Sequence, residues 1–176
     1  MDVFKAITER RSIRKFKEEE IEDDLIYKII EAGKWAPSAG NLQSWDAVLV
    51  KDPEIKQKLE AAAYMRDFVG KAPVIIVLGA NEHKSATIYH ERGRDLFSIQ
   101  DATIAGQNML LAIHALGLGA CWVGAFDEEL VSRTLEFPGY MRPIAIIPMG
   151  YPDETPPPPL RRELEEIIRW ERFHEI

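Results

Sequence analysis

Three arginines and a serine stand close together near the N-terminus, in the stretch "RRSIRKF" that begins at Arg10. Guanidinium groups donate forked, charge-assisted hydrogen bonds to phosphate oxygens, and a hydroxyl group can complete such a site. The alternative is a solvated basic turn whose arginines pair with the acidic residues 18–20, and this segment alone favours that alternative. The candidate residues for a phosphate site are Arg10, Arg11, Ser12 and Arg14.

A second stretch, "WAPSAGNLQSW", is poor in side-chain bulk although tryptophans bound it at Trp35 and Trp45. Small residues and amides in a loop let the backbone approach a flat ligand or another chain closely. Asn41 offers both a hydrogen-bond donor and an acceptor. We expect this loop to face a ligand and the two tryptophans to be core anchors that flank it.

Familiar catalytic and metal-binding motifs are missing from the sequence. Cys121 lies in an apolar stretch, which predicts a small core residue, and the four histidines have no partner at metal-ligand spacing. There is no G-x-S-x-G, no Walker loop, and no G-x-G-x-x-G after a strand. We therefore expect no catalytic side chain and no metal. The residues suit chemistry that a bound cofactor performs while the protein positions it.

The composition indicates one acidic globular domain, residues 1–176. The chain has 176 residues, of which 46% are hydrophobic. This content is enough for one core, and the length is too short for two ordinary domains. A net charge of -7 argues against a nucleic-acid partner. The single cysteine and the absence of a signal-peptide core predict a cytoplasmic protein. Glycines interrupt the apolar tract at 109–126, so we expect no membrane span there.

Periodicity and turn residues predict the elements that position these stretches. Strands and helices do not alternate strictly, so we expect an α+β fold with a single central, mostly antiparallel sheet flanked by helices. The predicted strands are 46–51, 72–80, 120–126 and 142–152. The predicted helices are a short one capped by Asp2, then 22–36, 53–63, 94–116, 127–135 with Asp127 as its cap, and 160–173.

Two features of this pattern predict a partner chain. The helix at 94–116 is apolar nearly all round, so it must be buried on all sides, and one small domain rarely achieves that alone. The proline run 156–159 is a semi-rigid spacer that separates the last helix from the preceding strand. We expect residues 156–176 to form a C-terminal arm that reaches across to the partner.

Four segments in this order resemble the nitroreductase family of FMN-dependent oxidoreductases. They are "RRSIRKF", "WAPSAGNLQSW", "IQDATIAGQNMLLAIHALGLGACWVGAF", and "PIAIIPMGYP" followed by "RRELEEII". The resemblance implies an α+β homodimer with two FMN molecules at the subunit interface. It also implies a two-step exchange in which NADH or NADPH reduces FMN, which then reduces a nitroaromatic, quinone or flavin acceptor.

The resemblance also implies a role for individual residues. The first motif would hold the FMN phosphate and ribityl chain, a loop from the other subunit would lie along the flavin ring, and backbone N–H groups would face the ring's N5 edge. The phosphate set is Arg10, Arg11, Ser12 and Arg14, with Arg161 as the returning arginine and Arg162 as the second choice. The ring set is Pro37, Ser38, Ala39, Asn41 and Gln43 from the loop, and Gly124 and Ala125 from the later strand.

The chain departs from the family pattern in ways that leave alternatives open. Ser44 stands where relatives often carry proline, which is expected to loosen the loop. Either Arg66 or Asp67 could approach the ring, and residues 89–97 could form a lid or a solvated interface segment. The alternative functions are an FMN-dependent dehalogenase, a flavin-degrading enzyme, or a flavin-binding dimer without turnover.

Overall fold

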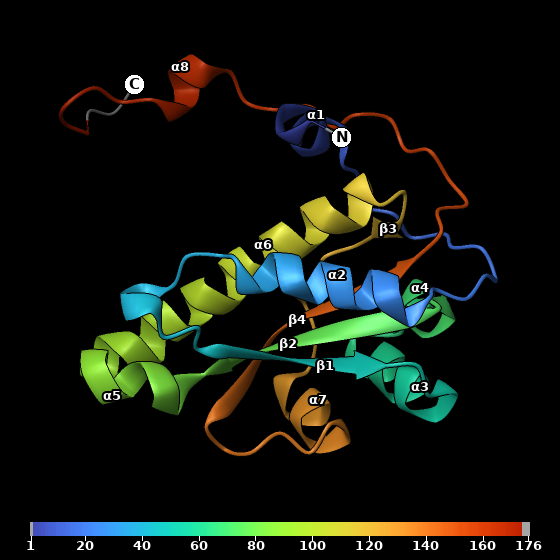
Figure 1. The fold of residues 1–176 in the computed structure, drawn as a ribbon, viewed down its shortest axis with the longest axis horizontal. Coiled ribbons are helices and arrows are strands. Elements are labelled where there is room, and N and C mark those ends of the chain that lie inside the picture. Colours follow the sequence, from blue (N-terminus) through green and yellow to red (C-terminus); the bar gives the residue numbers. More distant parts are fainter. Residues whose placement is uncertain (1, 174–176) are drawn as a thin grey trace.

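The fold is built on a four-stranded antiparallel sheet with the strand order β1-β2-β4-β3 (Figure 1). A computed structural model describes residues 2–173 of the chain. The arrangement confirms the predicted α+β class with one antiparallel sheet. The strands are β1 (Trp45–Val50), β2 (Val74–Asn81), β3 (Gly119–Ala120) and β4 (Met141–Gly150).

The sheet separates two layers of helices. The α-helices that precede α8 are α1 (Val3–Glu9), α2 (Asp23–Lys34), α3 (Pro53–Ala62), α4 (Asp67–Lys71), α5 (Glu82–Arg92), α6 (Ser98–Ala115) and α7 (Glu128–Thr134). Figure 1 shows α2 and α6 over one face and α3 and α7 over the other. Shorter helical pieces are η1 (Ala39–Asn41), a single 3-10 turn, η2 (Gly93–Phe97), a π-helical turn, and α8 (Leu164–Ile167).

Central strand β2 is buried on both faces, as its unbroken apolar run predicts. Ile76 and Leu78 belong to the core beneath α2 and α6, whereas Ile75 and Val77 belong to the core beneath α3, α4 and α7. Burying one such side chain stabilises the fold by about 1.5–3 kcal/mol. This strand therefore fixes the sheet to which both helical layers are attached.

Helix α6 packs very closely on its neighbours through two glycines. A Cβ atom at Gly106 would lie 2.6 Å from side-chain atoms of both Leu78 and Trp122, and one at Gly33 of α2 would clash with the side chain of Met109. These close approaches hold α6 firmly against the sheet and against α2. Its outer side is not covered by its own chain, since Ile104 is 39% exposed.

Capping side chains explain where α3, α5 and α7 begin. The side chain of Asp52 accepts hydrogen bonds from the N–H groups of the first turn of α3, and Asp127 does the same for α7, as predicted. Asp2 stands at the N-cap position of α1, but its side chain makes no capping hydrogen bond. Helix α5 was not predicted, although the Asn81 side chain caps it by accepting a hydrogen bond from Lys84 N.

Two predicted elements are wrong in extent. The predicted helix at 160–173 is reduced to the four residues of α8, because its apolar side chains, Leu164 and Ile167 among them, stay exposed and no packing supports a longer helix. The predicted strand at 120–126 shrinks to the end of β3 and one isolated bridge at Val123. Among residues 2–173, no helix has the length and apolar character needed to cross a membrane.

Candidate functional site

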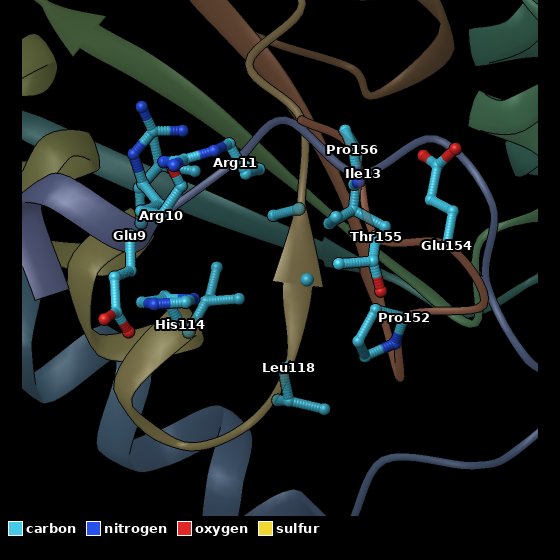
Figure 2. Close-up of a pocket in the computed structure, with 14 residues that line it drawn as sticks. Glu9, Arg10, Arg11, Ile13, His114, Leu118, Pro152, Glu154, Thr155 and Pro156 are labelled. Carbon is cyan, nitrogen blue, oxygen red and sulfur yellow. The ribbon is translucent and has the colours of Figure 1, made fainter. Parts of the chain in front are cut away.

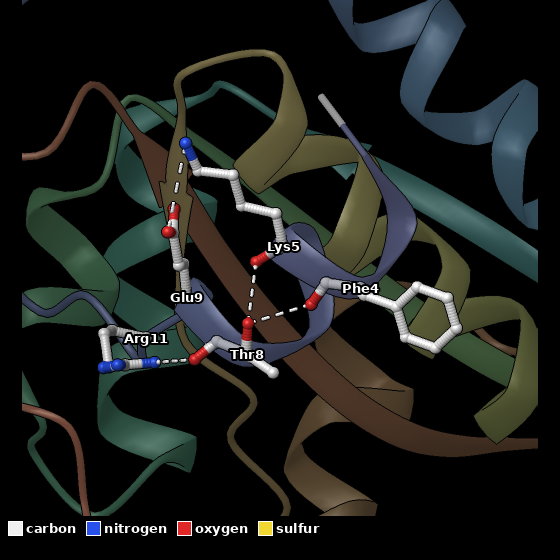
Figure 3. A network of polar contacts seen from close by, with 5 residues as sticks. All are labelled: Phe4, Lys5, Thr8, Glu9 and Arg11. Carbon is white, nitrogen blue, oxygen red and sulfur yellow. Dashed lines mark hydrogen bonds and ion pairs between the residues drawn. The ribbon is translucent and has the colours of Figure 1, made fainter.

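The arginine-rich stretch leaves the end of α1 and runs along β3 at the edge of the sheet. Ser12 forms a parallel bridge with Ala120, and Ile13 N donates a hydrogen bond to the Ala120 carbonyl oxygen at 2.9 Å. The last turn of α1 orients the next side chain, because Arg11 Nη1 donates to the Thr8 carbonyl oxygen at 2.7 Å (Figure 3). Strand pairing and helix end together fix the backbone that carries the arginines.

Positive charges gather here, close to two carboxylates. Glu9 and Glu154 line the same cavity as Arg10 and Arg11, and Glu154 Oε1 accepts hydrogen bonds from Arg14 N and Lys15 N. Burial lowers the pKa of Arg10, and the neighbouring Arg161 and Arg11 guanidinium groups lower it further. Within residues 2–173, no ion pair joins any arginine of "RRSIRKF" or Arg161 to a carboxylate, so the alternative pairing with residues 18–20 is absent. In a chain of net charge -7, such a local cluster of guanidinium groups has the chemistry that binding of an anion requires.

A cavity of about 200 Å³ opens beside this cluster (Figure 2). Arg10 and Arg11 form one wall, residues of the 152–156 segment form another, and Leu110 and Ile113 of α6 contribute apolar side chains. Figure 2 places His114 below the arginines. Its Nε2 atom is buried without a hydrogen-bond partner in the described part of the chain, and burial lowers its pKa. The imidazole is therefore neutral at pH 7.

A second group of residues lies next to the cluster. The thiol of Cys121 interacts with Ser12, Arg14 and Arg66, which oppose the rise in its pKa caused by burial. Arg66 Nη1 donates a hydrogen bond to the Ala125 carbonyl oxygen at 3.2 Å, so Arg66 joins this group. Asp67 instead forms a surface ion pair with Lys71 at 2.6 Å. The geometry therefore favours Arg66 over Asp67 as the residue near the site.

The segment after Val123 presents unpaired backbone donors. Gly124 and Ala125 are exposed, and within residues 2–173 their N–H groups donate no hydrogen bond. Beside these two residues, the Arg66 guanidinium donates a hydrogen bond to the Ala125 carbonyl oxygen. Adjacent N–H groups of this kind can stabilise negative charge that develops on a ligand.

The small-residue loop is closed by a buried carboxylate of α6. Asp101 Oδ1 accepts a hydrogen bond from Ala39 N at 3.0 Å. Its Oδ2 accepts from Ser44 N at 3.3 Å and from Ser44 Oγ at 2.6 Å. Inside the loop, Ser38 Oγ accepts from Gln43 N at 2.9 Å. Ser44 is fully buried, so the expectation that it loosens the loop is wrong.

The loop backbone holds three residues in the left-handed region. Gly40, Asn41 and Gln43 have φ values of +56°, +56° and +50°. For the two non-glycine residues this conformation is uncommon and persists only where the surroundings enforce it. A Cβ at Gly40 would lie 2.7 Å from Tyr89 Oη, so residues 82–92 pack against the loop.

A hollow of about 340 Å³ lies at this loop, lined by Trp35, Pro37, Asn41 and Gln43 among others. The prediction that both tryptophans are core anchors is wrong for Trp35, which is 78% exposed and donates from Nε1 to Glu31 at 3.0 Å. Trp45 packs against the core as predicted. Trp35 instead forms an aromatic wall beside the loop.

The two groups lie at opposite ends of α6. Asp101 holds the loop in the first turn of this helix, and His114 lines the arginine cavity in its last turn. At a rise of 1.5 Å per residue, those two positions are about 20 Å apart. The structure brings the predicted phosphate residues together with Ala125, but it places the loop residues at the other end of the helix.

Sequence reasoning missed two residues of these groups. Asp101 is a lone acidic residue in an otherwise apolar helix, and a buried charge of that kind signals a set of hydrogen-bond donors nearby. His114 stands in the last turn of the same helix, and no sequence pattern links it to Arg10. Only the folded chain shows that His114 and Arg10 line the same cavity.

The fold is an α+β structure with a cluster of arginines at the edge of the sheet and an amide-rich loop at the other end of α6. The chain belongs to the nitroreductase family, whose model matches residues 7–66 and 60–151. This confirms the resemblance seen in the four segments.

Individual relatives cover most of the chain. A protein from Methanothermobacter thermautotrophicus, provisionally described as an NADH dehydrogenase or NAD(P)H nitroreductase, is 37% identical over 160 residues, covering 89% of this chain and 80% of its own. An NADH dehydrogenase from Thermus thermophilus is 33% identical over 97% of this chain and 96% of its own. The structure of an NADPH:FMN oxidoreductase from Vibrio harveyi, complexed with NAD+, has a TM-score of 0.91 at 28% identity, covering 99% of this chain and 79% of its own.

Proposed function

We propose that this chain is an FMN-dependent oxidoreductase that passes hydride from NADH or NADPH to a small acceptor such as a nitroaromatic compound, a quinone or a free flavin. The observation that carries the proposal is the unpaired cationic cluster around Arg10 beside the unpaired N–H groups of Gly124 and Ala125. The names of the relatives, which include an NADPH:FMN oxidoreductase, support the same reaction class.

The donor set fits the charge pattern of FMN. A phosphate dianion needs several cationic donors that are not already paired, and the cluster offers guanidinium groups and a hydroxyl. A flavin ring needs flat, closely approaching backbone and donors at its edge, which the loop and residues 124–125 offer. The proposed phosphate residues are Arg10, Arg11, Ser12, Arg14 and Arg161, and the proposed ring residues are Pro37, Ser38, Ala39, Asn41, Gln43, Gly124 and Ala125.

The proposed site requires two copies of the chain. The distance of about 20 Å between Asp101 and His114 exceeds the reach of the ribityl chain that joins phosphate and ring. We propose a homodimer in which the loop of one protomer completes the site that the cluster of its partner begins. The uncovered side of α6 at Ile104 and the exposed apolar residues of the arm, such as Leu160 and Trp170, support this assembly.

The proposed roles of the chain's own groups are to bind, orient and stabilise charge. FMN, when bound, supplies the two-electron chemistry by accepting hydride and delivering it to the acceptor. The N–H groups of Gly124 and Ala125 stabilise negative charge at the ring edge, and Asn41 orients that ring through its amide. Water supplies protons, so no general acid is required. We further propose that residues 1–176 form a single domain and that the protein is cytoplasmic.

The test is a visible absorption spectrum of the purified protein, before and after anaerobic addition of NADH and then NADPH. A flavin band that bleaches with either donor is the expected result, and it identifies the donor. A flavin band that never bleaches would favour a binding dimer without turnover, and a colourless protein that ignores added FMN would overturn the proposal. Rapid oxygen use with destruction of the flavin would instead indicate a flavin-degrading enzyme, and halide release from halogenated aromatics a dehalogenase.

A further inference from the structure

We propose that Asp101 is the positioning residue of the loop at residues 39–44, with Ser44 as its partner. The inference rests on the proposed function, because it assigns this loop to the flavin ring. Asp101 touches neither the cluster nor residues 124–125, so it acts through the loop and is not a catalytic residue. It is 3% exposed, and within residues 2–173 no cation pairs with it.

The carboxylate clamps both ends of the loop at once. One oxygen holds Ala39 N, where the turn begins, and the other holds Ser44 N and Oγ, where the chain enters β1. A buried carboxylate without a cation depends on such donors for its stability. Within residues 2–173, all three hydrogen bonds that Asp101 accepts come from this loop, so the same contacts stabilise the buried charge and close the loop.

The clamp explains how the loop keeps its unusual backbone. Asn41 and Gln43 both have positive φ, which requires surroundings that enforce it. With the two ends tied to one side chain on α6, the intervening residues have little freedom to relax. Because α6 packs closely on the sheet at Gly106, the hydrogen bonds of Asp101 attach the loop to a rigid element.

Position 44 supplies two of the three contacts to Asp101. A proline there would lack the N–H group that Asp101 accepts, and it would lack the hydroxyl that makes the 2.6 Å contact. Proline stiffens a loop by restricting φ, whereas the pair of Ser44 and Asp101 stiffens it by a charge-assisted hydrogen bond.

The experiment compares the binding of FMN and riboflavin, which share the ring but differ in the phosphate. Asp101→Asn keeps the shape of the side chain but turns one acceptor oxygen into a donor that faces an N–H group of the loop. Dissociation constants are measured by quenching of flavin fluorescence, and visible circular dichroism reports the surroundings of the bound ring. Ser44→Ala removes only the hydroxyl contact and leaves both backbone contacts in place.

A matched control tests whether any buried polar loss on α6 has the same effect. Ser98 is fully buried one turn before Asp101, and its Oγ donates to the Arg94 carbonyl oxygen at 2.7 Å without touching the loop. Ser98→Ala should change thermal stability but leave flavin affinity and the circular dichroism of the ring unchanged. This variant separates positioning from general damage to the helix.

We expect Asp101→Asn to weaken FMN and riboflavin by the same factor, tenfold or more, and to alter the ring spectrum. Ser44→Ala should act in the same direction by a smaller factor. The double variant should resemble Asp101→Asn alone, because both substitutions disrupt the same interaction between Ser44 and Asp101. If Asp101→Asn does not fold, Ser44→Ala decides. Unchanged affinity and spectrum in Ser44→Ala, or an effect on FMN alone, would overturn the inference. A wild-type protein that binds neither flavin would overturn the proposed function as well.

Discussion

Replacing Arg161 by alanine tests the phosphate end of the proposed site. Arg161 lies close enough to Arg10 to lower its pKa, although 150 residues separate them in the chain. Neither side chain forms an ion pair with a carboxylate in the described structure. An arginine held beside like charges gains from a dianion that neutralises the group. We therefore expect Arg161→Ala to lower the affinity for FMN and to spare riboflavin.

The magnitude follows from the contact that is lost. A hydrogen bond to a charged group contributes about 1.5–3 kcal/mol, which corresponds to roughly 10- to 100-fold in affinity. Arg161 is exposed, so water screens its charge and the lower end of that range applies. The loss should shrink as ionic strength rises, because screening weakens the interaction in the wild-type protein.

Arg162 provides the matched control on the next residue. Its guanidinium donates to the Glu166 carbonyl oxygen at 2.5 Å and pairs with the Glu166 carboxylate at 3.5 Å, so it is occupied within the arm. Fluorescence titration of both variants with FMN and riboflavin, at low and high salt, gives the comparison. Equal losses in Arg161→Ala and Arg162→Ala, or a loss with riboflavin as large as with FMN, would refute the reasoning.

Two further substitutions test other parts of the site. Asn41→Ala should shift the reduction potential of the bound flavin and lower the melting temperature only slightly, because alanine tolerates the positive φ of position 41 less well than asparagine; a potential equal to wild type would remove Asn41 from the ring. Burial lowers the pKa of His114 in the folded protein below the value of about 6.5 in the unfolded chain. The unfolded chain therefore binds a proton more readily below about pH 6.5, and the free energy of unfolding falls as the pH decreases below that value. His114→Gln should flatten this pH dependence in urea unfolding between pH 7 and 5.5, and identical slopes would contradict the assignment.

The core of the fold could be predicted because its signals are local. The apolar run of β2 and the proline that follows α2 carry their meaning in a few residues. Helix α7 begins where Asp127 predicts it, because a cap is a contact between near neighbours. Such features need no knowledge of the rest of the chain.

The missed features depend on residues distant in the sequence. The helical pattern of residues 160–173 lacks a surface to pack on within its own chain, so the periodicity alone does not produce a long helix. Ser44 gains its role only from Asp101, which is 57 residues away. The membership of Arg66 in the site likewise depends on Ala125, 59 residues away.

The extended arm has a thermodynamic consequence. Its apolar side chains, from Leu160 at 98% exposure to Phe173, release little burial free energy within their own chain. That free energy becomes available only on association, so it enters the stability through mass action. Melting temperature should therefore rise with protein concentration. Dilution would then loosen the flavin without any change in the residues that hold it.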